Sequence, residues 1–263
     1  MPTKMMLRRR QRLGQYRIEA RISVGGFAEV YRAYDTVEGI RVAMKMPHQE
    51  LVDADTLNAF RREVRVAAKL DNPNILPIKT AGMVDDRFVI VTPLGVESLG
   101  DRLERRLARS AALSYMEQLL DALACAHRNK VVHLDVKPEN LILFPEHRLR
   151  LADFGLARVA RRTMSASGSG TLGYIAPEQA LGKPSMRSDV FSAGLIMWKL
   201  MSGGLPEWPF KWPYPKHERA AKSWHPALIQ VIRRALAVDE KKRYPTAVAM
   251  RIAFNKAKDR ALL

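Results

Sequence analysis

Residues 133–155 read HLDVKPENLILFPEHRLRLADFG, and this stretch decides how the rest of the chain is interpreted. Two short apolar runs, LILF at 141–144 and LRLA at 149–152, are separated by proline and polar residues at 145–147. Apolar runs of this length around a turn signal predict a β-hairpin. The residues just before and just after the hairpin should therefore lie close together.

Three acid or amide side chains occupy those flanking positions, since Asp135 and Asn140 precede the hairpin and Asp153 follows it. Transfer of a phosphoryl group needs oxygen ligands for magnesium and a carboxylate that orients and deprotonates the attacking hydroxyl. The three residues offer this set, and Lys137 can meet the negative charge of phosphate. The alternative interpretation is that they are ordinary polar turn residues beside a hairpin.

The octamer HLDVKPEN followed by DFG resembles the catalytic loop and the metal-binding loop of the protein kinase family. The segment GTLGYIAPE at 170–178 resembles the part of that family that docks a protein substrate, and Thr171 with Lys137 matches the serine/threonine branch. Leu134 departs from the family, because many members carry an arginine that pairs with a phosphate on the activation segment. We therefore expect activity that does not require such a phosphate in the usual way.

The resemblance extends over about residues 14–255 and implies a role for each polar residue of the catalytic loop. Asp135 would accept the hydroxyl proton, and Lys137 would stabilise charge on the transferred group. Asn140 and Asp153 would hold Mg²⁺ or Mn²⁺.

Upstream of the catalytic loop, alternating apolar residues predict a mainly β segment. Strands are expected at 16–23, 28–37 and 41–47, and a helix at 53–70. Lys45 lies near the end of the third strand, and Glu63 falls on the apolar face of the helix. An acid on an apolar face needs a cationic partner, and the resemblance supplies Lys45, which in the family holds the α- and β-phosphates of ATP.

A glycine-containing turn joins the first two predicted strands, where the lack of a Cβ lets backbone amides approach phosphate closely. The family's loop carries three spaced glycines, whereas Ser23 and Ala28 take the first and third positions here. Looser or altered nucleotide binding is therefore expected. The Thr92 carbonyl and the Leu94 amide would bind adenine, although several of the apolar positions fit a plain core equally well. The ATP contacts implied by the resemblance are Ile22, Ser23, Gly25, Gly26, Val30, Ala43, Lys45, Thr92, Leu94, Ile142 and Asp153.

The fold class implied is α+β, with the two lobes of a protein kinase. We expect a basic, structure-poor tail at 1–13, a small, mainly β N-lobe at 14–94 with one key helix, and a larger, mainly helical C-lobe at 95–263. The C-lobe should include a helix at 110–127 with Ser110 as its N-cap. The resemblance also pairs Glu178 with a buried Arg243 and makes Asp189 brace the catalytic-loop backbone.

Composition limits the classes of partner. The chain has 263 residues with 44 Lys and Arg against 27 Asp and Glu, a net charge of +17, which can attract acidic partners. A generally basic surface without a dedicated partner is the alternative, and no nucleic-acid partner is expected because no binding motif accompanies the charge. The single cysteine, Cys125, excludes an internal disulfide, and no apolar run is long enough for a membrane span. We predict a cytoplasmic protein.

The sequence therefore predicts a serine/threonine protein kinase that uses ATP and magnesium, acts on proteins and phosphorylates itself. The alternatives are a pseudokinase-like nucleotide-binding module and a small-molecule kinase of related fold. Phosphate acceptors within the activation segment are hypothesised at Thr163, Ser165, Ser167 and Ser169. Partner arginines are hypothesised at Arg158, Arg161 and Arg162.

Overall fold

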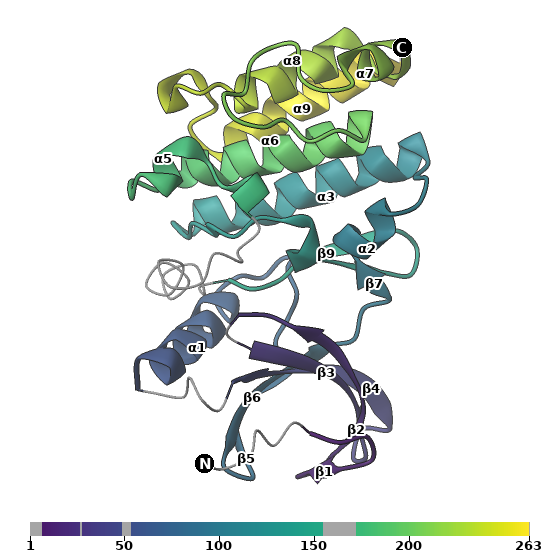
Figure 1. Ribbon diagram of the computed structural model, residues 1–263, viewed down its shortest axis with the longest axis vertical. Coiled ribbons are helices and arrows are strands. Elements are labelled where there is room, and N and C mark those ends of the chain that lie inside the picture. Colours follow the sequence, from purple (N-terminus) through teal and green to yellow (C-terminus); the bar gives the residue numbers. More distant parts are fainter. Residues whose placement is uncertain (1–6, 27, 49–53, 155–171, 263) are drawn as a thin grey trace. The chain divides into compact units, whose positions relative to one another are not determined.

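The computed structural model describes residues 7–26, 28–48, 54–154 and 172–262 (Figure 1). The chain forms two compact units. The first contains the described residues up to Ala68 together with Leu76–Gly95. The second contains Lys69–Ile75 and the described residues from Val96 onward. The change at Gly95 lies one residue from the lobe boundary expected after Leu94, and the assignment of these units as domains stays a prediction.

The first unit is a curled antiparallel sheet with one helix, and its strands follow the order β1-β2-β3-β4-β6-β5 (Figure 1). Its elements are β1 (Arg12–Leu13), β2 (Tyr16–Val24), β3 (Ala28–Asp35), β4 (Ile40–Pro47), α1 (Ala54–Ala67), β5 (Thr80–Val84) and β6 (Arg87–Pro93). One sheet face carries a core that includes Tyr31, Val42, Met44 and Val91. These alternate positions are buried because successive side chains of a strand point to opposite faces.

The tail expected at 1–13 is wrong for its described part. Leu7 and Leu13 are buried in the same core, and β1 pairs with the start of β2 through Arg12↔Arg17. The physical reason is that the two leucines within the basic run have apolar surface to bury, and the backbone beside them can extend the sheet. The run of arginines concealed this pattern.

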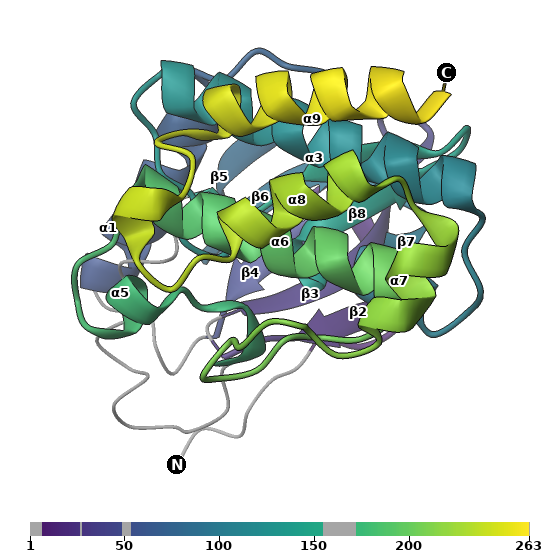
Figure 2. The ribbon, with the colours of Figure 1, turned by 90° about the horizontal axis from the view of Figure 1, so that it is seen from above.

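The second unit is mainly helical and carries a three-stranded sheet, β7-β8-β9. Its elements are β7 (Glu97–Ser98), α2 (Leu99–Leu103), α3 (Arg109–Arg128), η2 (Pro138–Asn140), β8 (Leu141–Phe144), β9 (Arg148–Leu151), η3 (Leu172–Tyr174), α5 (Pro177–Ala180), α6 (Met186–Ser202), α7 (His217–Ser223), α8 (Pro226–Ala235), η4 (Glu240–Lys242) and α9 (Ala247–Leu262). Helix α3 packs on α6 and α9, and α8 packs on α6 and α9 (Figure 2). No helix in the described ranges is long and apolar enough to cross a membrane.

Helix α6 is the centre of this unit, because its residues are buried on nearly every side. It begins with a capping box, in which the Ser185 and Ser188 side chains and backbones bond reciprocally. It ends at Ser202, and its C-cap is Gly203, whose φ of 75° lies in the left-handed region that glycine adopts at helix ends. The N-cap expected at Ser110 is wrong, since α3 begins one residue earlier with Ala108 at the cap and no side-chain capping bond.

The predicted hairpin is formed by β8 and β9, with register Phe144↔Arg148 and Leu141↔Leu151. The turn residues Glu146 and His147 have φ values of 63° and 55°. The hairpin is held to α3 by Gln118, whose side chain bonds to backbone groups of His147 and Leu149. The segments directly before and after the hairpin are therefore held in place within the second unit.

Candidate active site

Lys45 and Glu63 form an ion pair within the first unit. Lys45 lies on β4, where it is paired with Val30 of β3 and Ile90 of β6. Its Nζ is 3.1 Å from Glu63 Oε1 and 3.3 Å from Oε2, and also lies 5.6 Å from the centre of the Phe60 ring. The side chains are only 11% and 6% exposed. The predicted pair is thus present, and the apolar face of α1 carries its carboxylate.

Four residues predicted to contact ATP share one face of the sheet. The pairings Val30↔Lys45 and Ala43↔Thr92 place directly opposed residues on the same face, and Ala43 lies two residues before Lys45. All four are half-buried, unlike the core positions between them. Leu94, also half-buried, follows directly after β6.

The glycine-containing turn is closed by its own backbone. The Gly25 amide donates to the Ala28 carbonyl at 2.8 Å, and a ring nitrogen of His48 lies 2.7 Å from the Gly25 carbonyl. A Cβ at Gly25 would lie 3.4 Å from the Ala28 carbonyl oxygen, and one at Gly26 would meet nothing within 4 Å. Ile22 and Ser23 are exposed at the end of β2. The turn therefore leaves open space at Gly26, as close approach of a ligand requires.

In the second unit, the catalytic loop holds Asp135 between a cation and an amide. Lys137 Nζ lies 3.0 Å from Asp135 Oδ2, and Asn140 Nδ2 donates to the same oxygen at 2.9 Å. The Asp135 side chain is 37% exposed, so it is accessible to an incoming hydroxyl. Of the residues predicted for this site, these three are brought together, and Ile142 lies two residues further on, half-buried in β8.

The hydrogen bonds of Asn140 also orient its side-chain oxygen. Both its bonds to Asp135, at the backbone oxygen and at Oδ2, use Nδ2 as donor. Oδ1 is therefore the end of the amide available to a cation. Asp153 follows Ala152, whose amide donates to the Asn140 carbonyl at 2.8 Å. An amide oxygen and a carboxylate are hard ligands that fit Mg²⁺, which commonly takes one or two protein groups together with phosphate and water.

Asp189 fixes the backbone of the catalytic loop. Its buried carboxylate accepts the His133 amide at 2.8 Å and the Leu134 amide at 2.7 Å. His127 Nε2 lies 2.9 Å away and must carry a proton, because its Nδ1 accepts the Ala247 amide. The carboxylate thus has three donors from two elements, and the brace predicted for Asp189 is present.

His133 links the loop to the residue before Asp153. Its Nδ1 accepts the Asp135 amide at 3.2 Å, which makes Nε2 the protonated nitrogen that donates to the Ala152 carbonyl at 2.8 Å. Its ring also packs edge-on against Phe154, with centroids 4.6 Å apart. One buried side chain therefore connects both segments that flank the hairpin.

We expect Asp189→Asn to lower the free energy of unfolding by about 1–3 kcal/mol, because an amide would present N–H groups to N–H donors. The catalytic rate constant should also fall as the loop loses its anchor. Urea unfolding and steady-state kinetics measure the two effects, with the exposed Asp259→Asn of α9 as control. If both variants had the same stability and the same rate, the hydrogen bonds of Asp189 to the loop would contribute to neither.

Glu178 and Arg243 form the second predicted ion pair. Arg243 Nη1 and Nη2 donate to the two carboxylate oxygens at 2.8 and 2.9 Å, and Ser188 Oγ donates to Oε1 at 2.6 Å. Burial alone raises the pKa of Glu178, but the bonds from Arg243 and Ser188 outweigh it and hold the pKa below its ordinary value. The fully buried guanidinium is thereby neutralised next to the central helix.

Comparison with known families decides what this arrangement is. Residues 16–254 match the family model described as protein kinase domain. The chain belongs to the protein kinase family. The kinase is 33% identical over 270 residues to the serine/threonine-protein kinase PrkC of Bacillus subtilis, covering 94% of this chain and 41% of PrkC. It is 35% identical over 206 residues to the serine/threonine-protein kinase PknA of Mycobacterium tuberculosis, covering 73% of this chain and 48% of PknA. It thus spans less than half of either relative.

Solved structures agree with the fold. The kinase domain of PknI from Mycobacterium tuberculosis matches with a TM-score of 0.72 and 25% identity, covering 96% of this chain and all of that one. The apo form of PpkA-294 matches with a TM-score of 0.80 at 22% identity, over 95% and 99% of the two chains. The family and the α+β kinase fold predicted from the sequence are confirmed.

Two further contacts, one to the catalytic loop and one to the Asp189 that anchors it, were not expected from the sequence. Gln179 Nε2 donates to the Leu134 carbonyl at 2.7 Å, and His127 reaches Asp189 from the end of α3. Leu134 itself has a φ of 64°, an uncommon value for a branched residue. No sequence pattern marks these residues as partners, because they come from separate helices.

Several predictions fall on residues outside the described ranges. These are the glycine of DFG, the docking residue Thr171, the hydroxyls Thr163, Ser165, Ser167 and Ser169, and the arginines Arg158, Arg161 and Arg162. They stay predictions.

Proposed function

We propose that this chain transfers the γ-phosphate of ATP to serine and threonine hydroxyls of proteins. The observation that carries the proposal is the Asp135 carboxylate, accessible to solvent and held by Lys137 and Asn140 on a loop anchored by Asp189. Membership of the family and similarity to two named serine/threonine-protein kinases support it.

Asp135 would orient the attacking hydroxyl and accept its proton. Its Oδ2 is held by two donors, which fixes the carboxylate and leaves Oδ1 as the oxygen for the hydroxyl. Lys137 contributes a positive charge that can stabilise the phosphoryl group as it transfers. General base catalysis of this kind typically contributes about 10²- to 10⁴-fold in rate.

Magnesium, when bound, would neutralise phosphate charge, and Asn140 and Asp153 would be its ligands. The orientation of the Asn140 amide fits this role. Among the residues that the structure describes, no group of three or more His, Cys, Asp or Glu side chains is arranged for a metal. A site of only two protein ligands suits Mg²⁺, which keeps much of its shell for phosphate oxygens and water. Mn²⁺ has the same ligand preference.

In the first unit, Lys45 would bind the α- and β-phosphates, with Glu63 holding its ammonium in place. The half-buried residues on the same sheet face, Val30, Ala43 and Thr92, would contact the adenosine part of ATP. Ile22, Ser23, Gly25, Gly26, Leu94 and Ile142 complete the nucleotide contacts that we propose.

We expect Lys45→Met to lower kcat/KM for ATP by about 10- to 100-fold, since a charge-assisted hydrogen bond to phosphate is worth about 1.5–3 kcal/mol. The change also removes a cation beside the buried Glu63, so a fall in the melting temperature should accompany it. Steady-state kinetics and thermal unfolding check both, with Lys69→Met, an exposed lysine, as control. An unchanged kcat/KM would contradict the proposed phosphate contact.

The acceptor class can be tested directly. The kinase is incubated with Mg·ATP carrying a labelled γ-phosphate, with a generic protein acceptor in one arm and sugars and aminoglycosides in another. Label on serine or threonine of the acceptor or of the chain itself supports the proposal. Label on small molecules alone would indicate a small-molecule kinase. ATP binding without any transfer would indicate a pseudokinase.

Protein substrates are the partners that this function requires, and acidic segments suit the net charge of +17. The cytoplasmic location stays a prediction.

A further inference from the structure

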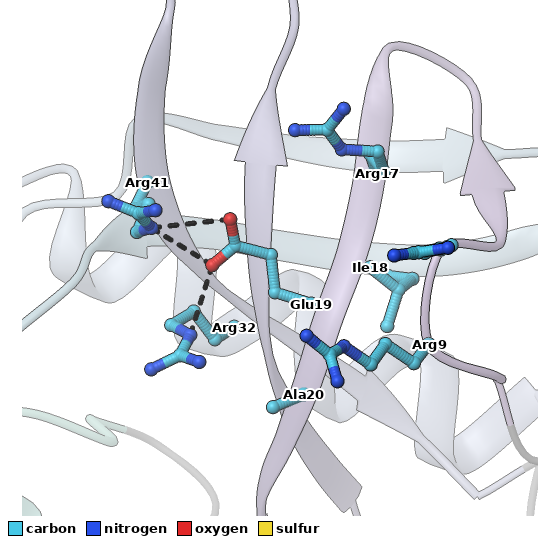
Figure 3. A pocket seen from close by; sticks show the side chains of 8 residues that line it. Arg9, Arg17, Ile18, Glu19, Ala20, Arg32 and Arg41 are labelled. Carbon is cyan, nitrogen blue, oxygen red and sulfur yellow. Dashed lines mark hydrogen bonds and ion pairs between the residues drawn. The ribbon is translucent and has the colours of Figure 1, made fainter.

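A pocket of about 690 Å³ lies within the first unit (Figure 3), and none of its lining residues is assigned above to ATP or to phosphoryl transfer, although Arg32 is directly opposite Ala43 on the same sheet face. Five of its eight lining residues are arginines, and a single carboxylate accompanies them. These six residues are Arg9, Arg10, Arg17, Glu19, Arg32 and Arg41. They are called the arginine pocket below.

The strand register explains why three of the arginines meet. Tyr34 of β3 is directly opposite both Arg17 of β2 and Arg41 of β4, so these side chains share a sheet face. Arg32 lies two residues before Tyr34 and points to that face as well. The Arg17 guanidinium lies 5.1 Å from the centre of the Tyr34 ring.

The remaining two arginines come from the segment before β1. Arg10 has a φ of 70°, and its amide donates to the Ile18 carbonyl at 2.8 Å. The Ile18 amide returns a bond to the Gln11 carbonyl at 2.9 Å, while Leu7 is buried in the core. These backbone hydrogen bonds hold Arg9 and Arg10 against β2, where the two residues form one wall of the pocket.

The charges in the pocket do not balance. Glu19 Oε2 lies 3.1 Å from Arg32 Nε in an ion pair and accepts the Nε–H of Arg41 at 2.9 Å (Figure 3). Within the described ranges, no carboxylate pairs with Arg9, Arg10 or Arg17. Glu19 thus fixes two guanidinium groups, and the arrangement as a whole carries four uncompensated positive charges.

An anion would relieve the repulsion between these groups, and the guanidinium fork matches phosphate oxygens in geometry. None of the eight lining residues is aromatic, so the pocket offers no ring on which a nucleobase could stack. The chemistry therefore favours a phosphate group over a strand of nucleic acid.

We propose that the arginine pocket binds a phosphate monoester, as carried by phosphoserine or phosphothreonine in a protein or by a sugar phosphate. The inference concerns binding alone and does not depend on phosphoryl transfer by the chain. Phosphate monoesters would then be the ligands of part of the chain's positive charge.

Binding is measured by calorimetry with three probes: a phosphoserine peptide, the same peptide with serine, and glucose 6-phosphate. The proteins are the wild type, the triple variant Arg9→Ala, Arg10→Ala, Arg17→Ala, and a control that loses the same charge through Arg106→Ala, Arg128→Ala, Arg260→Ala. The three control arginines are exposed and lie in the second unit. Thermal unfolding checks that each variant is folded. If the triple variant does not fold, the binding comparison is repeated with Arg9→Ala alone.

We expect the phosphorylated peptide or the sugar phosphate to bind the wild type, and the pocket variant to bind it about tenfold or more weakly. The control should stay within about twofold of the wild type, because distant charges are screened by salt. The probe that binds identifies the source of the monoester. Equal weakening in both variants, equal binding of the serine peptide, or no binding of either monoester would overturn the proposal.

Discussion

We expect Asp135→Asn to lower the rate of phosphoryl transfer by about 10²- to 10⁴-fold, the contribution typical of a positioned general base. The amide is nearly the same size as the carboxylate, and its oxygen can still accept one hydrogen bond from Lys137 or Asn140. It cannot accept a proton from the attacking hydroxyl at neutral pH. The loss should therefore appear in kcat, with the KM for ATP and the melting temperature close to those of the wild type.

The control for this variant is Asp259→Asn, which removes a carboxylate from the exposed surface of α9. Initial rates with saturating Mg·ATP and a protein acceptor compare the two variants with the wild type. A rate for Asp135→Asn within a factor of about ten of the control would contradict the role of this carboxylate as base.

We expect Arg243→Ala to destabilise the second unit by about 3–5 kcal/mol, the usual cost of removing one partner of a buried ion pair. The guanidinium is fully buried, donates to both Glu178 oxygens and to the Ala237 carbonyl at 2.6 Å, and stacks 4.4 Å from the centre of the Phe191 ring. A loss of this size is a large part of the 5–15 kcal/mol that stabilises a typical protein. Urea unfolding measures it.

The exposed Arg260→Ala of α9 serves as the control for charge and should leave the free energy of unfolding within about 0.5 kcal/mol of the wild type. Arg243→Lys should recover only part of the loss, because one ammonium cannot bond both carboxylate oxygens in the same geometry. If Arg243→Ala and the control had the same free energy of unfolding, the ion pair would contribute nothing to stability.

The pH dependence of this effect follows from the lowered pKa of Glu178. A carboxyl group with a lower pKa in the folded state stabilises the fold fully above its unfolded-state pKa of about 4.3. That contribution is lost as the pH falls through the lower, folded-state value. The stability difference between wild type and Arg243→Ala should accordingly be largest near neutral pH and shrink in acid.

The catalytic loop was predictable from the sequence because its chemistry lies within one short stretch. Asp135, Lys137 and Asn140 fall within six residues, and the hairpin after them has a plain apolar pattern with a turn signal. The pairing of Lys45 with Glu63 was predictable from the need of an acid on an apolar helix face for a cation, together with the family resemblance. The structure reproduces both groups.

Long-range partners within each unit were harder to predict. Gln179 of α5 meets the Leu134 carbonyl, and His127 of α3 meets Asp189 of α6, only through the packing of these helices, which no local pattern records. The N-terminal segment was misread because four arginines among residues 8–12 suggested a solvated tail, although Leu7 and Leu13 pack it against the sheet. The arginine pocket follows from that same anchoring, since it places Arg9 and Arg10 beside β2.

Protein kinase activity is tested most directly by the transfer of labelled γ-phosphate from ATP to a protein acceptor, followed with Mg²⁺ present and after its removal by a chelator. We expect label on serine or threonine that requires the metal and returns when Mg²⁺ or Mn²⁺ is restored. Binding of ATP without transfer under any of these conditions would contradict it.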